Sequence, residues 1–275
     1  MVETNDRSRA LPVLKLSASA TKEYWEVPIL HEDEHLLAIA KPACLLTSPD
    51  RYDPRRPNLI RMLLDGVAQQ VPWAVQHGLQ YIANAHRLDF ETTGVLLLAK
   101  DRPTLVSLAD QFGNAKPAKT YLALVTGNPA EENFTVDLNL GPDPRQPGVM
   151  RWTKSGKPSL THFTVRERFS GISLIECRPV TGRTHQIRVH LSAVGHPIFG
   201  DETYGGRRLF LSRLKPGYRS KSGLAERSLT PSLSLHAWKL ELIHPTTGVP
   251  VCIEAPWPKD LTVVLKYLRQ YAAFA

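Results

Sequence analysis

The sequence predicts an α+β fold: a single domain with a largely antiparallel mixed sheet flanked by helices. Strand-like segments outnumber helical ones, and several follow each other directly across short turns. Strands and helices do not alternate regularly, which argues against a doubly wound parallel sheet. The 275 residues contain no internal repeat and no low-complexity linker, so one domain is favoured over two.

In the N-terminal part, apolar runs define the strands. Residues 1–26 are polar and mixed in charge, and we expect them to be a loosely ordered extension. Residues 35–42 form a mostly apolar run that a proline ends, as is typical of a buried strand. Residues 94–100 and 120–126 are two further strands of this kind.

Three segments show helical spacing of their apolar residues. These are residues 58–71, 102–112 and 261–274. In the second, Pro103 suits the first turn of a helix. Its predicted buried face consists of Leu105, Leu108, Ala109 and Phe112.

The C-terminal part is expected to contain two hairpins. Residues 160–169 and 172–179 are joined at Ser170-Gly171, and residues 235–244 and 249–255 turn at residues 246–248. Residues 141–158 contain four prolines and three glycines, which predicts a long loop.

Composition places the chain among globular proteins, with 42% hydrophobic and 22% charged residues. The three cysteines are far apart and form no CxxC pair, so neither a disulfide framework nor a zinc site is expected. The longest apolar run, residues 94–99, is far shorter than the roughly 20 residues of a membrane span. Residues 1–26 lack the apolar core of a signal peptide. We therefore expect a cytoplasmic protein without metal, and the net charge of +8 suits a polyanionic partner.

Two segments carry candidate functional groups. The first, residues 85–94, places Arg87, Asp89 and two threonines in a loop before a strand. An isolated aspartate is usually a turn former, and the neighbouring groups are what single out Asp89.

The second segment is residues 182–197. Here Thr184 is expected to cap a helix that ends near Gly195 and has Ile187, Leu191 and Val194 on its apolar face. Arg183 and Arg188 suit an anion, although Arg188 equally suits a solvated helix surface. His185 and His190 are five residues apart, which is not the spacing of a helical metal pair.

Residues 205–230 are strongly basic. Seven Arg or Lys residues oppose one Glu, and Phe210 and Tyr218 lie among them. This mixture suits phosphate contacts with occasional base stacking, and the alternative is a solvated face. Motifs of serine hydrolases, phosphate-binding loops and dinucleotide sites are missing from the sequence.

The segment HRLDFETTGVLLLAK at residues 86–100 resembles the catalytic motif of the RluA-type pseudouridine synthases. The resemblance extends in consistent order over residues 27–260. Its other parts are ILHEDEHLLAIAKP at 29–42, KTYLA at 119–123, RPVTGRTHQIRVHLSAVGHPIFGDETYG at 178–205, and LHAW at 235–238. Thr93 stands where the family usually has Ser, and Cys44 where it usually has Gly. If that site requires a positive φ, Cys44 is strained.

The resemblance implies isomerisation of uridine to pseudouridine in structured RNA, ribosomal or transfer RNA, by a catalytic domain at residues 27–275. Asp89 is the expected essential carboxylate, which either adds to the base or assists at the ribose carbon. Arg188 is the expected cation beside it, with Arg183 as the alternative. Tyr121 resembles the active-site tyrosine of the family, and Arg87 is expected to fill the space of the extruded base. Other expected RNA contacts are Arg183, His86, Arg207, Arg208, Arg213 and Lys215.

No cofactor is expected, because the isomerisation is redox-neutral, and we expect a monomer. An S4-type RNA-binding domain does not fit ahead of residue 27. Two other functions are possible for such a sequence. One is a non-catalytic RNA-binding or ribosome-assembly protein, which intact Asp89, Tyr121 and Arg188 disfavour. The other is a glycoside hydrolase, for which Asp89 and Glu91 are the only close pair of acids in the motif.

Overall fold

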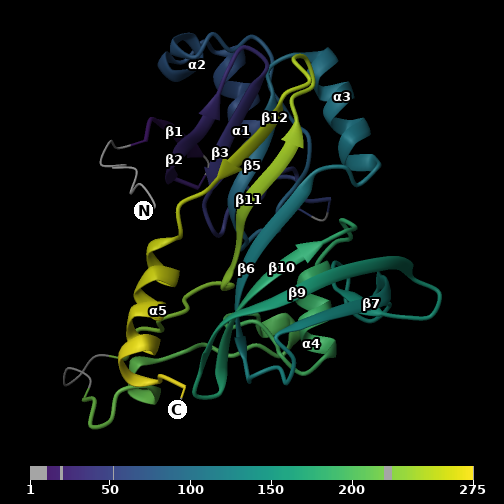
Figure 1. Ribbon diagram of the computed structural model, residues 1–275. Helices are drawn as coiled ribbons and strands as arrows, with labels where there is room; N and C mark the ends of the chain where they lie inside the picture. The colour runs from purple at the N-terminus through teal and green to yellow at the C-terminus, as the bar shows by residue number, and fades with distance from the viewer. Residues whose placement is uncertain (1–10, 19–20, 52, 220–224, 275) are drawn as a thin grey trace, which may run out of the picture.

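The computed structural model describes residues 11–18, 21–51, 53–219 and 225–274. Twelve strands form one sheet in the order β1-β2-β3-β5-β11-β6-β10-β9-β7-β8, with β12 paired to β11 and β4 paired to β5. Figure 1 shows helices on both sides of this sheet, which confirms the predicted fold class. The strands are β1 Val13–Ala18, β2 Glu23–Glu32, β3 Leu36–Lys41, β4 Ala83–Asn84, β5 Thr93–Ala99, β6 Ala118–Thr126, β7 Asn133–Pro142, β8 Met150–Trp152, β9 Lys157–Phe169, β10 Ile172–Pro179, β11 Leu235–Ile243 and β12 Pro250–Glu254. The helices are α1 Leu59–Ala68, α2 Pro72–Gln76, α3 Arg102–Gly113, α4 Gln186–Ala193 and α5 Lys259–Tyr271, with short 3₁₀ turns η1 Glu202–Tyr204 and η2 Leu211–Arg213.

The sheet consists of two halves that meet at a parallel pair, β5 with β11. His236 lies opposite Thr93, and Ala237 lies opposite Gly94. Gly94 has a φ of 114°, and a Cβ at this position would overlap the carbonyl of Ala237. The close approach of the two backbones therefore requires glycine. The Thr93 hydroxyl is 2.8 Å from Nδ1 of His236, so Thr keeps the hydroxyl that Ser supplies in the family pattern.

Four apolar clusters hold helices against the sheet. In the half that contains β1–β5, α1 packs on one face and α3 on the other, the latter through Leu108. In the half that contains β6–β10, α4 packs on one face through Leu191, and α5 packs on the other through Leu265 and Leu268. Burial of each apolar side chain contributes about 1.5–3 kcal/mol. Among the described residues, no helix is both long and apolar enough to cross a bilayer.

The predicted N-terminal extension is wrong for its described part. Residues 13–18 form β1, whose buried Leu14 and Leu16 alternate with exposed residues, and β1 pairs with β2 at 23–32. Alternation between only two leucines is too short to stand out in a polar segment. Residues 1–10 and 19–20 lie outside the described part of the chain.

Two further expectations need correction. The predicted loop 141–158 contains the three-residue strand β8, which pairs with the end of β7. The sequence analysis did not predict β8. Ala109 is exposed on α3, whose buried residues are Thr104, Leu108 and Gln111. The other three predicted residues, Leu105, Leu108 and Phe112, pack in the apolar cluster as expected. Gln111 is buried as well, and it donates to the carbonyl of Ile243 in β11, a contact that no local pattern reveals.

Cys44 occupies a left-handed position with a φ of 56°, so the strain that was conditional on its φ is present. We predict that Cys44→Gly raises the free energy of unfolding by about 1 kcal/mol, because glycine adopts this φ without a steric penalty. Urea denaturation measures the change. Cys252→Gly is the matched control: Cys252 lies in β12, where glycine lowers stability. A Cys44→Gly protein no more stable than the wild type would contradict the strain argument.

Candidate active site

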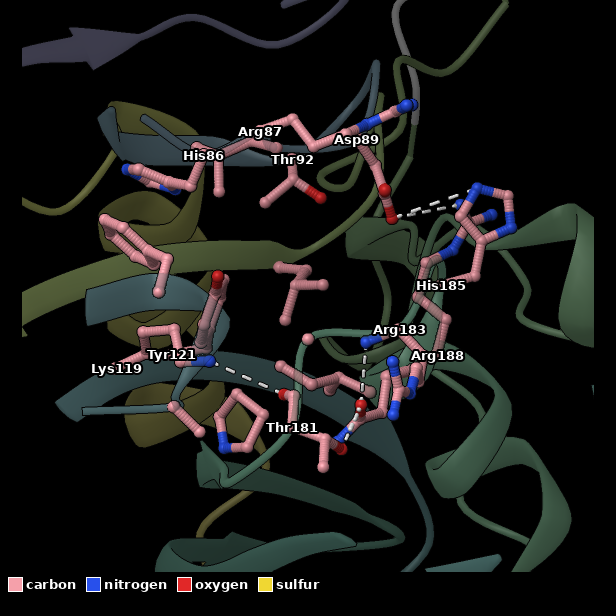
Figure 2. Close-up of a pocket in the computed structure, with 18 of the residues that line it drawn as sticks. His86, Arg87, Asp89, Thr92, Lys119, Tyr121, Thr181, Arg183, His185 and Arg188 are labelled. Atoms are coloured by element: carbon pink, nitrogen blue, oxygen red, sulfur yellow. Dashed lines mark hydrogen bonds and ion pairs between the residues drawn. The ribbon is translucent and has the colours of Figure 1, made fainter. Parts of the chain in front are cut away.

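A cavity of about 370 Å³ opens between the loop that precedes β5, the start of β6 and the start of α4. Its size lies within the roughly 300–1,000 Å³ of small-molecule sites. Asp89, Tyr121 and Arg188 line it, and so do Arg87, His86 and Arg183. The structure thus brings together residues from three separate parts of the chain (Figure 2).

The backbone on each side of Asp89 is held by buried side chains. The Thr47 hydroxyl donates to the Leu88 carbonyl at 2.9 Å and accepts from the Leu88 amide at 3.2 Å. On the other side, Lys41 Nζ donates to the Phe90 carbonyl at 3.1 Å. Asp89 therefore projects from a loop whose neighbours are both anchored.

Lys41 is the Lys of the Lys-Pro motif and is only 1% exposed. Its Nζ also donates to the carbonyls of Pro42 and Leu45, at 2.8 and 2.7 Å. Burial lowers the pKa of Lys41 to about 7, against the attraction of Asp89. Three carbonyl acceptors match the three N–H donors of the ammonium form, so this lysine ties β3 to the Asp89 loop.

Arg188 is the cation beside Asp89. Its Nη1 lies 3.6 Å from Asp89 Oδ2, and its Nε and Nη2 each donate to Asp201 at 2.8 Å. Burial disfavours the charged guanidinium, but hydrogen bonds to Asp201 and the charges of both carboxylates raise the pKa of Arg188. The bidentate contact orients the guanidinium, because two parallel hydrogen bonds fix its plane.

Arg183, the alternative partner, is exposed at the cavity edge. Its Nε donates to the carbonyl of Pro158 at 3.1 Å. Of the two arginines, Arg188 is therefore the one that pairs with Asp89.

Tyr121 projects from β6 into the cavity (Figure 2). Burial, and then the charge of Asp89, raise the pKa of Tyr121 above its usual value. The phenol is therefore protonated at neutral pH. A flat apolar ring beside a carboxylate can hold a planar base against the cavity floor.

Comparison with known proteins gives this site a context. Residues 35–193 match the sequence profile of the family described as RNA pseudouridylate synthase. Ribosomal large subunit pseudouridine synthase D of Nitrosomonas europaea is 38% identical over 243 residues, 88% of this chain and 65% of that protein. Synthase C of Salmonella typhi is 38% identical over 246 residues, 89% of this chain and 70% of that protein.

The chain belongs to the RNA pseudouridylate synthase family. Among solved structures, human RNA pseudouridylate synthase domain containing 4 is similar, with a TM-score of 0.64 and 26% identity over 88% of this chain and 92% of that one. The family and the enzyme class predicted from the sequence, an RNA isomerase, are thus confirmed. The chain spans about two thirds of the length of the curated relatives it matches.

Two residues of the first motif have different surroundings. Arg87 is exposed at the cavity edge, where a guanidinium can reach RNA. His86 accepts from the Leu97 amide through Nε2 at 3.0 Å and stacks on Phe112. Burial, followed by the charge of Lys119, lowers the pKa of His86 to about 3. The neutral ring therefore supports the loop, and its contact with RNA stays a prediction.

The predicted cap of α4 is wrong. Thr184 is exposed and does not cap the helix, which begins at Gln186 after His185 in a left-handed conformation. Val194 lies beyond the helix end and is 40% exposed. Gln186 accounts for the difference: its side chain receives hydrogen bonds from the Thr181 hydroxyl and the Arg183 amide, which turns the chain before the helix.

The described residues of the basic segment have different contacts. Arg207 and Arg208 follow Tyr204 near the site, and Arg208 pairs with Glu202 at 3.0 Å. Further along, Leu214 packs with the α5 cluster, and Lys215 lies over the ring of Tyr271 at 5.7 Å. Leu209, next to Arg208, packs in the same cluster, and the three arginines and one lysine predicted here to bind RNA are not among the residues that line the cavity. Lys221 lies outside the described residues.

Sequence reasoning assigned no role to Lys41, Thr47, Asp201 or Tyr204. Lys41, Asp201 and Tyr204 lie within the motifs that resemble the family, so their position in these motifs could have indicated a role. Thr92 is also in a motif; it lines the cavity, and its buried hydroxyl has no partner among the described residues. Among all the residues that the structure describes, no group of three His, Cys, Asp or Glu residues is arranged to hold a metal ion.

We predict that Arg188→Met lowers turnover by at least about 100-fold with little loss of RNA affinity, because it leaves Asp89 and buried Asp201 without their cation. Arg183→Met should mainly weaken binding. Single-turnover rates and binding isotherms separate the two effects. The opposite pattern would transfer the role of the paired cation to Arg183.

Proposed function

We propose that this chain isomerises uridine to pseudouridine in large-subunit ribosomal RNA, with Asp89 as the essential carboxylate. The observation that carries the proposal is the placement of Asp89, 3.6 Å from buried Arg188, in the cavity that Tyr121 also lines. The names of the curated relatives support ribosomal over transfer RNA. We further propose that the protein acts in the cytoplasm as a monomer.

The target uridine leaves the RNA stack at a cost of a few kcal/mol, and Arg87 at the cavity edge fills the vacated space. The bond between N1 and the ribose C1′ breaks, and a bond from C5 to C1′ forms. C5 loses a proton and N1 gains one, so atoms and electrons balance. Asp89 acts either on the ring or at C1′.

Arg188 places a positive charge 3.6 Å from the Asp89 carboxylate, where it can offset negative charge during the reaction. Tyr121 supports the base by stacking. Its raised pKa argues against a resting phenolate that removes the C5 proton.

The two alternatives from the sequence fit less well. A non-catalytic RNA-binding protein does not need a buried arginine shared between two carboxylates. A glycoside hydrolase needs two acids facing one cleft. Glu91 is not among the described residues that line the cavity with Asp89.

We expect Asp89→Asn to abolish pseudouridine formation while RNA affinity and fold are kept, because the amide retains shape but not charge. Carbodiimide mapping of unmodified large-subunit ribosomal RNA measures the product. Glu91→Gln, a matched change two residues away, should leave the product intact. If Asp89→Asn forms product at more than about 1% of the wild-type rate, the activation free energy has risen by less than about 2.7 kcal/mol. That result would contradict the assignment of Asp89.

The different contacts of Arg208, which pairs with Glu202, and Lys215, which lies over Tyr271, predict unequal effects of two matched double variants. Changing Arg207 and Arg208 to Ser should lower the slope of log affinity against log salt by about 0.7–0.9 for each phosphate that the variant no longer neutralises. Changing Lys215 to Ser, with or without Arg213, should lower the slope less, because Lys215 lies over the ring of Tyr271 in α5. Fluorescence anisotropy at several salt concentrations measures both. An equal decrease of the slope in the two variants would mean that the whole segment binds RNA.

A further inference from the structure

His185 holds a conformation that histidine rarely adopts. It precedes α4 with a φ of 55°, in the left-handed region, and its side chain does not cap the helix. Such strain persists where surrounding contacts require it and is concentrated at functional sites. The side chain lines the cavity and points toward Asp89 (Figure 2).

Tyr204 determines which ring nitrogen of His185 carries the proton. The Met150 amide donates to the Tyr204 oxygen at 2.9 Å, so this oxygen already accepts a hydrogen bond. Its own O–H is therefore available as the donor to His185 Nδ1, which lies 2.7 Å away. In the neutral ring, a hydrogen bond accepted at Nδ1 leaves the proton on Nε2.

The protonated nitrogen faces the essential carboxylate. His185 Nε2 lies 4.0 Å from Asp89 Oδ2, the same oxygen that Arg188 Nη1 approaches at 3.6 Å. Both distances exceed a hydrogen bond, and contacts of this kind shorten when substrate fills a site. The two donors converge on one carboxylate oxygen, and Oδ1 has no partner among the described residues.

We propose, on the basis of the proposed function, that His185 is a positioning residue: as the Nε2–H tautomer set by Tyr204, it and Arg188 hold Oδ2 so that Oδ1 reacts. Burial lowers the pKa of His185, although the negative charge of Asp89 acts in the opposite direction. The net decrease keeps the ring neutral. The groups that act on it are Asp89, Arg188, Asp201, Arg87 and Tyr204.

Two substitutions of His185 separate positioning from strain. His185→Gln places an amide N–H near the position of Nε2 and keeps a donor toward Asp89. His185→Asn tolerates a positive φ better but ends near Nδ1, too short to reach Asp89. A structural role alone makes Asn the better replacement in both stability and activity. The positioning role makes Gln the more active variant despite lower stability.

The experiment measures single-turnover pseudouridine formation on unmodified large-subunit ribosomal RNA, together with RNA affinity and thermal unfolding. We expect His185→Asn to lower the rate constant about 10- to 100-fold with affinity unchanged, and His185→Gln to recover most of that loss. Tyr204→Phe keeps the ring over Arg188 and should lower the rate constant about tenfold, because it removes the hydroxyl that selects the tautomer. His162→Asn, at an exposed position on β9, serves as the control and keeps the wild-type rate.

Each outcome bears on a different claim. Rate constants of His185→Asn and Tyr204→Phe equal to wild type, or Asn more active than Gln, would overturn the positioning role and leave the proposed function in place. A wild-type protein that binds the RNA but forms no pseudouridine would overturn the proposed function, and the inference with it.

Discussion

The contact of Gly94 with Ala237 joins the two halves of the molecule. β5 and β11 run parallel here, and the carbonyl of Ala237 occupies the space that a Cβ of residue 94 would need. Asp89 lies five residues before this contact, and Tyr121 lies opposite Ala237 in the neighbouring pair β11–β6. The distance across the cavity therefore depends on how closely two backbones approach, which explains a glycine at the end of the Thr-Thr-Gly segment.

One buried arginine, Arg188, forms ion pairs with two carboxylates, those of Asp89 and Asp201. Asp201 is 1% exposed and holds Arg188 by two hydrogen bonds, while Asp89 lies slightly farther from the same guanidinium. A buried ion pair is weak evidence for stability, because desolvation offsets much of the attraction. Its contribution here is orientation: Asp201 fixes the arginine by two hydrogen bonds, and the guanidinium lies near Asp89 at a distance longer than a hydrogen bond.

The loops around the site are anchored by buried polar groups rather than by apolar packing alone. Lys41 and Thr47 hold the backbone on both sides of Asp89. Tyr204 is held by the Met150 amide at its hydroxyl and by the Ser192 hydroxyl at its carbonyl. Fully hydrogen-bonded buried networks favour one arrangement strongly, because any displaced group would lose its partners without reaching water. A site assembled from distant segments needs such restraint on each of them.

The sequence by itself determined the family, the main buried strands and which residues were expected to line the cavity. Apolar runs such as residues 94–100 form strands because their burial depends on local pattern, and the motif around Asp89 is long enough to be specific. The tertiary structure alone decided which cation meets Asp89, how His185 is turned, where α4 begins, and that Lys215 lies over a ring of α5. The physical reason is that each of these depends on a partner distant in the chain: Asp201 and Asp89 for Arg188, Tyr204 for His185, and Tyr271 for Lys215. Local spacing carries no information about such contacts until the sheet has brought them together.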